Sequence, residues 1–330
     1  MAKRNQSCAL PDDDPIMLGL QGFELDPGAA RKLERALKKD PSDMRARLQL
    51  LTYHNRYSYT SKLIAQKHLA DVIWMIENVP DHPTLRTPWA SIDKTRNPAG
   101  YESCKRLWLK QIRQAGSNVA IIRNAAWFLR ANERLAERLH LQAISIKPND
   151  SSLYRDLACL LRRGAPKRSA RLKRALDAQQ KAMAKQRDPQ MKRYLLDDLA
   201  EIAFDLGEWK IARAAAEKSL AQAEKYHDWY TGNAIHDGNT VLGRLALREG
   251  DENKAIAHLK QASKIPGSPQ LNSFGPNMIL AQELMQLGHR KAVVSYLKGC
   301  KRFWDGESTR LDACIQALER GETPKLPRMR

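Results

Sequence analysis

The chain has 330 residues, of which 42% are hydrophobic and only 6% are aromatic, and its formal net charge is +19. The hydrophobic share suffices for a buried core, whereas the few aromatic residues and the modest glycine content disfavour sheet and sandwich folds. The five cysteines are scattered, odd in number and without a C-x-x-C pair, so we expect neither a disulfide framework nor a zinc site, and we infer a reducing compartment.

The first 26 residues are expected to form a flexible tail, because prolines and glycines interrupt any helical period there. Asp12, Asp13 and Asp14 stand where a signal peptide needs an unbroken apolar stretch. The best apolar run, Val72 to Ile76, is far shorter than the roughly 20 residues that cross a bilayer. We therefore expect no membrane span and a cytoplasmic protein.

The rest of the chain reads as helices in succession. Helical hairpins are expected over residues 27–79, and the segment 80–100 contains four prolines, which predicts a structured excursion between two blocks of repeats. Repeated helical pairs are expected over 101–304. A capping helix and a basic tail follow over 305–330, with Ser308 as the N-cap and Gly321 as the stop.

A stripe of small residues recurs along these helices. Two glycines, Gly207 and Gly250, each precede the first small residue of a stripe by five positions, which predicts a tight turn followed by a helix. Small residues on one stripe let neighbouring helices approach closely, as in stacked helical hairpins. The three stripes are Ala136, His140 and Ala143, then Ala212, Ala216 and Ser219, and then Ala255, Leu259 and Ala262.

On this spacing, the chain from about residue 118 to 304 resembles the tetratricopeptide-repeat (TPR) family. Two strings, "GNAIHDGNTVLGRLALREGD" and "GSPQLNSFGPNMILAQELM", look like those of bacterial TPR proteins without an assigned activity. The resemblance implies an all-α, right-handed TPR-like solenoid of helical hairpins whose groove binds a partner. The exposed groove contacts are expected from the first helices of the hairpins and are Tyr154, Arg162, Asp197, Glu201, Arg244 and Arg248.

Some members of the family grip a partner's C-terminal carboxylate with Lys and Asn from successive first helices. Aligning the units on their glycines places no Lys and no Asn at those positions: the residues there are Tyr154, Asp197 and Thr240, and then Ala158, Glu201 and Arg244. The carboxylate-clamp mode is therefore not expected here.

The positive charge concentrates in the middle of the chain. Between Lys105 and Arg193 there are 22 Lys and Arg residues against 6 acidic residues. Such a field attracts phosphate backbones or acidic protein tails, although solvated outer helix faces explain it equally well and no nucleic-acid-binding motif accompanies it. The densest part has no acidic residue within it and consists of Arg162, Arg163, Lys167, Arg168, Arg171, Lys173 and Arg174.

A polar and aromatic string between two repeat units is the one place that resembles an active constellation. Its possible site residues are His227, His236 and Asp237, since imidazole and carboxylate are common metal ligands. The structural alternative is favoured: Asp237 or Asn239 caps the next helix, His236 satisfies a buried backbone group, and the aromatic residues fill a joint between hairpins.

The sequence thus predicts a non-catalytic scaffold that binds a protein or peptide partner through its groove and needs no cofactor or metal. The first alternative is a nucleic-acid or polyanion binder that uses the basic residues 162–174. The second is a metal-dependent enzyme centred on the His-Asp string.

Overall fold

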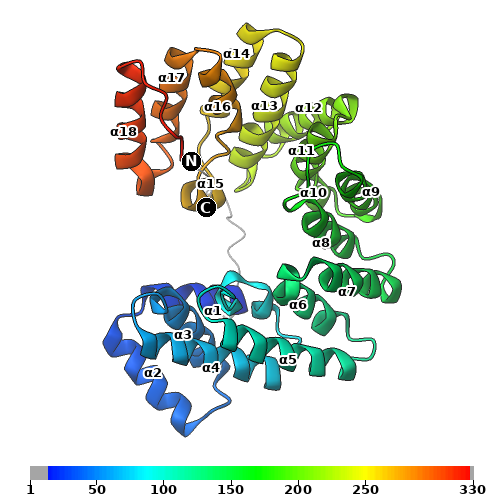
Figure 1. The fold of residues 1–330 in the computed structure, drawn as a ribbon, viewed down its shortest axis with the longest axis vertical. Helices are drawn as coiled ribbons and strands as arrows, with labels where there is room; N and C mark the ends of the chain where they lie inside the picture. The colour runs from blue at the N-terminus through cyan, green and yellow to red at the C-terminus, as the bar shows by residue number, and fades with distance from the viewer. Residues whose placement is uncertain (1–13, 328–330) are drawn as a thin grey trace, which may run out of the picture. The chain divides into compact units, whose positions relative to one another are not determined.

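The computed structural model describes residues 14–327, and the chain divides into two compact units, Met1–Asn149 and Asp150–Arg330. Within the described part, the chain is all-α and contains no strand (Figure 1). Successive helices pack against one another as antiparallel hairpins, which confirms the predicted TPR-like helical-hairpin solenoid.

Each α-helix of the first unit begins at a side chain that caps its N-terminus. Asp26 accepts hydrogen bonds from the N–H groups of Gly28 and Ala29, and Pro27 follows at the first helical position, where its missing N–H costs nothing. The α-helices of this unit are α1 (Pro15–Gln21), α2 (Pro27–Lys39), α3 (Met44–Tyr57), α4 (Lys62–Asn78), α5 (Pro98–Gln114), α6 (Val119–Phe128) and α7 (Glu133–Ile146). Short 3₁₀ turns are η1 (Gly22–Glu24), η2 (Pro83–Arg86), η3 (Pro88–Ala90) and η4 (Leu129–Ala131).

The second unit pairs a first helix with a second helix four times. The pairs are α8 (Ser151–Arg162) with α9 (Ala170–Lys185), α11 (Leu196–Leu206) with α12 (Trp209–Lys225), α13 (Thr231–Arg248) with α14 (Glu252–Ala262), and α16 (Ile279–Gln286) with α17 (Arg290–Cys300). Between them lie α10 (Pro189–Arg193) and α15 (Pro269–Phe274), and η5 (Asp305–Glu307) leads into α18 (Ser308–Glu319), which packs on α17. First helices α11, α13 and α16 contact one another in that order.

The predicted stripes of small residues are buried in the helix joints. In α14, Ala255 and Ala262 are fully buried and Leu259 is buried beside them, and the corresponding residues of α7 and α12 are buried as well. Because an alanine adds no bulk beyond its methyl group, these joints bring helix backbones close together. The small-residue reading of the sequence is therefore confirmed.

Glycine makes the hairpin turns tight. Gly207 (φ +93°) and Gly250 (φ +80°) adopt the left-handed conformation that side chains disfavour, and each directly follows the last turn of a first helix. Their N–H groups close back onto carbonyls of that turn. This is the turn that the glycine spacing predicts.

The structure differs from the predicted division and boundaries of the chain in several places. Residues 15–24 of the expected tail form α1 and η1, because Asp14 caps α1 by accepting hydrogen bonds from the N–H groups of Ile16 and Met17; residues 1–13 lie outside the described part. The division between the two units falls at 149/150, inside the expected 101–304 segment. The helix after η5 begins at Ser308 but no side chain caps it, whereas Gly321 (φ +86°) adopts the left-handed conformation just beyond its end.

A hydrophobic core stabilises the C-terminal half of the second unit. It joins α13, α14, α16, α17 and α18 through buried aliphatic and aromatic side chains that include Leu284, Tyr296 and Trp304. Over residues 14–327, none of the helices combines the length and the apolar character needed to cross a bilayer.

Candidate binding face

The charges of the second unit are segregated between first and second helices. The first helices α8, α11, α13 and α16 carry seven acidic residues and four arginines, whereas the second helices α9, α12, α14 and α17 carry fourteen Lys and Arg residues and four acidic residues. A chain with a net charge of +19 therefore presents an acidic surface along its first helices. We call this surface the first-helix face and define it by Arg162, Asp198, Glu201, Asp205, Asp237, Arg244 and Glu283.

Arg162 joins α8 to α11 at one end of this face. Its Nη2 forms a short ion pair with Glu201, and its Nη1 lies 3.5 Å from Asp198 Oδ1. Burial alone would lower the pKa of Arg162, but the two carboxylates raise it. Arg162 therefore has two acidic neighbours from α11, which the run of basic residues around it in the sequence does not reveal.

Arg244 joins α13 to α11 and α16. Its Nε lies 3.2 Å from both carboxylate oxygens of Glu283, and its Nη1 lies 3.8 Å from Asp205. The guanidinium also covers the ring of Phe204 at 4.1 Å. Only 5% of its side chain is exposed, so the expected exposed contact is wrong, because two carboxylates and a ring enclose this arginine.

Asp197 is also buried, contrary to the expectation. Its two oxygens accept hydrogen bonds from Ser219 Oγ and from the Tyr230 hydroxyl, each at 2.6 Å. Burial raises the pKa of Asp197 to about 7, against the effect of these two hydrogen bonds and with the help of nearby Asp198 and Glu201. Asp197 thus ties α11 to α12 and to the start of α13 and is not a surface contact.

Asp237 is the carboxylate of the face without a Lys or Arg partner in the described part of the chain. Within residues 14–327 its side chain receives no hydrogen bond, and the ionisable side chain within 4 Å of it is His236, whose Nε2 lies 3.9 Å from Oδ1. Burial, followed by repulsion from Asp197, Glu201 and Asp198, raises the pKa of Asp237 well above its ordinary value. A cation brought to this point would relieve that repulsion.

His236 is fully buried and both of its ring nitrogens are used by backbone groups. Nδ1 lies 3.1 Å from the Ala262 carbonyl, and Nε2 accepts a hydrogen bond from the Asn277 N–H at 3.0 Å. Nδ1 therefore carries the proton, the ring is neutral, and burial lowers its pKa. Neither nitrogen is available as a metal ligand or a general base, and the prediction that His236 satisfies a buried backbone group is confirmed.

The structure does not assemble the His-Asp string into one site. His236, Asp237 and Asn239 lie inside α13 rather than in a connection, so the expected capping by Asp237 or Asn239 is wrong. His227 is exposed before that helix and lines a separate shallow cleft of about 430 Å³ with Asp188 and Gln190. Across the described part of the chain, no three His, Cys, Asp or Glu side chains are grouped as metal ligands.

The remaining predicted residues lie outside the acidic network. Tyr154 is half-buried with the Lys185 ammonium 5.7 Å from its ring, and Arg248 is exposed at the end of α13. In the basic stretch, Arg171 is half-buried and donates to the Leu160 carbonyl, so it contributes to packing. The exposed members of that stretch are Arg163, Lys167, Arg168, Lys173 and Arg174.

Sequence reasoning did not point to a second buried polar cluster, which lies in the first unit. His54 Nδ1 lies 2.6 Å from Asp71 on α4, and His54 Nε2 lies 3.1 Å from Glu34 on α2. Each ring nitrogen of His54 therefore faces a carboxyl group from a different helix. Lys67 and Arg47 surround the cluster. Its members come from three helices at unrelated spacings, so no motif marks them.

The comparisons with known proteins support the fold and leave the activity open. No protein-family model matches the sequence, and no curated protein matches it significantly. Among solved structures, the chain is similar to yeast Tom70, a TPR-containing protein, with a TM-score of 0.50 and 16% sequence identity. The match covers 97% of this chain and 66% of the Tom70 chain, so this chain spans about two thirds of its length. At that identity the likeness establishes the TPR-like fold alone.

Proposed function

We propose that this protein is a non-catalytic TPR-like scaffold that binds a protein segment carrying Lys or Arg on the first-helix face. The observation that carries the proposal is the charge segregation, in which an acidic face stands on a strongly basic chain. A cytoplasmic location and kinship with bacterial TPR scaffolds belong to the same proposal.

The geometry of the face suits a cationic partner. Its five carboxylates, at residues 198, 201, 205, 237 and 283, keep between 18% and 30% of their side-chain surface exposed. Arg244 is already enclosed by two of these carboxylates, so its positive charge contributes little to the electrostatic potential at the surface of the face. Asp237 has no donor within the described chain, so a Lys or Arg of the partner would supply the missing counter-charge.

Fluorescence anisotropy with a labelled Lys/Ala-rich peptide tests this proposal. Asp237→Asn removes the carboxylate without leaving an arginine unpaired, and we expect it to weaken binding about tenfold, the effect of one lost charge-assisted hydrogen bond. Glu217→Gln on α12 removes an equal charge from an exposed second helix and should leave the affinity within twofold.

The pH dependence offers a second readout. Because the pKa of Asp237 is raised, binding a cation requires loss of its proton, so affinity should rise with pH in the parent protein and less so in Asp237→Asn. Absence of peptide binding at low salt, or equal loss in the two variants, would rule the proposal out.

A second candidate is favoured by the cation excess of the second helices, which suits a polyanion. A labelled single-stranded oligonucleotide in the same assay tests it, with the slope of affinity against salt as the readout.

A further inference from the structure

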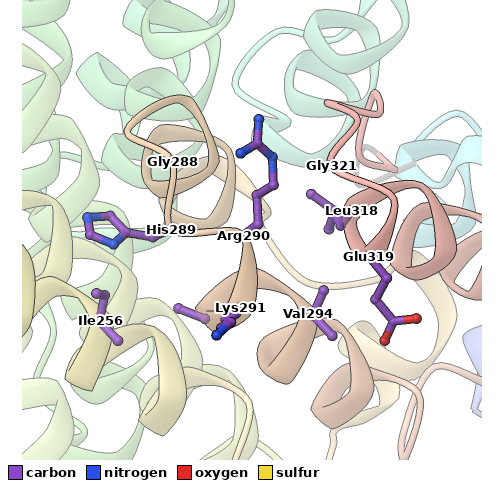
Figure 2. A pocket seen from close by; sticks show the side chains of 10 residues that line it. Ile256, Gly288, His289, Arg290, Lys291, Val294, Leu318, Glu319 and Gly321 are labelled. Carbon is purple, nitrogen blue, oxygen red and sulfur yellow. The ribbon is translucent and has the colours of Figure 1, made fainter.

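A groove at the C-terminal end of the second unit lies away from the first-helix face. It runs between α14, α17 and α18 and encloses about 970 Å³, which is at the upper end of the size range of ligand pockets. We call it the C-terminal groove. In Figure 2, Arg290 extends from the start of α17 between the turns at Gly288 and Gly321.

The floor of the groove is aliphatic. Ile256 and Val294 are half-buried and pack on the core of the second unit, and Leu318 of α18 lines the groove beside them. Half-buried floor residues mean that the groove is an open trough rather than a closed cavity. An open trough with an apolar floor suits side chains of a peptide laid along it.

The rim of the groove carries two cations without partners in the chain. Its other charged residues are occupied: His289 Nε2 lies 2.6 Å from Glu252, and Glu319 lies 3.1 Å from Lys298. In contrast, neither the Arg290 nor the Lys291 side chain has a hydrogen bond or ion pair within residues 14–327. The Nε of Arg290 is buried and still lacks an acceptor, which is unusual for a guanidinium.

We propose that the C-terminal groove binds an amphipathic segment of a partner protein that combines aliphatic side chains with Asp or Glu. The aliphatic side chains cover Ile256, Val294 and Leu318. A carboxylate of the segment pairs with the guanidinium of Arg290, which lines the groove, and Lys291 adds to the attraction. This surface is opposite in charge to the first-helix face, so the two faces select different partner chemistries.

The test uses the full chain and a fluorescein-labelled twelve-residue peptide of Leu, Asp and Glu at amphipathic-helix spacing. The double variant Arg290→Gln/Lys291→Gln changes two side chains without chain partners and should fold normally. We expect it to weaken binding at least tenfold. The matched control, Lys254→Gln/Lys260→Gln, removes two exposed charges from α14 outside the groove and should stay within twofold.

Two further arms test the aliphatic floor and the chemical nature of the occupant. Val294→Ser removes apolar surface from the floor and should weaken binding severalfold when measured well below the melting temperature of the variant. The proposal is overturned if the control variant loses affinity as much as the double variant, because the peptide is then attracted by the net positive charge of the protein and not by the groove. It is also overturned if the peptide fails to bind while decanoate does, which indicates a pocket for a small amphiphile. The first-helix face is probed with a cationic peptide, so either proposal can fail alone.

Discussion

Replacing His236 with leucine tests how the repeats of the second unit are held in register. Ala262 is the last residue of α14 and Asn277 precedes α16, so neither the carbonyl nor the N–H that His236 contacts has a partner within a helix. His236→Leu keeps the site apolar and filled but leaves both backbone groups unsatisfied.

The expected loss of stability follows from those two groups. Each unsatisfied buried backbone group costs about 1–3 kcal/mol, and the added leucine returns part of that through burial, so we expect a loss of about 2–4 kcal/mol. Urea unfolding followed by circular dichroism measures it. His289→Leu, at a partly exposed histidine paired with Glu252, is the control and should cost less than about 1 kcal/mol.

The same variant should change the dependence of stability on pH. Burial lowers the pKa of His236 below its ordinary value of 6.5, so the unfolded chain takes up a proton first as the pH falls. The contribution of His236 is therefore present above pH 6.5 and is lost below it. The stability difference between parent and variant should shrink from pH 7.5 to pH 5.5. An unchanged stability, or a difference that grows on acidification, would refute the register role of His236.

Two further outcomes are expected. The pKa of Asp197 is about 7 in the folded chain against 3.8 ordinarily, so its ionisation lowers the free energy of unfolding as the pH rises from about 4 to about 7, by at most about 1.4 kcal/mol per pH unit. Asp197→Asn should remove this decrease, and an equal dependence of unfolding free energy on pH in the parent and the variant, measured with urea, would contradict the expectation. Ala255→Glu forces a carboxylate into a fully buried joint and should cost several kcal/mol, whereas Ala257→Glu on the exposed side of α14 should be nearly neutral; equal melting temperatures would count against the close-packed joint.

The helices, the buried stripe of small residues and the glycine turns could be predicted from the sequence alone. Each depends on residues a few positions apart: Ala255, Leu259 and Ala262 share one face because of the helical period, and Gly250 is needed because of its own left-handed backbone. Such features are set by local geometry, so a single chain segment contains all the information needed.

The extent of α13 could not be read locally. The string from residue 226 to 239 contains polar residues and two glycines, which lower helix propensity and favoured a long connection. In the structure α13 begins at Thr231, because burial of His236, Asn239 and Thr240 against α14 and α16 outweighs that weak local preference.

The character of the candidate site was decided by tertiary structure. Alignment on the glycines placed Asp197 and Arg244 at groove positions, as exposed contacts, but both side chains are buried. Whether each side chain faces solvent depends on partners more than 20 residues away in sequence: Ser219 and Tyr230 draw Asp197 inward, and Asp205 and Glu283 enclose Arg244. Spacing within one helix carries no information about these partners, because they come from neighbouring helices whose packing only the folded chain establishes.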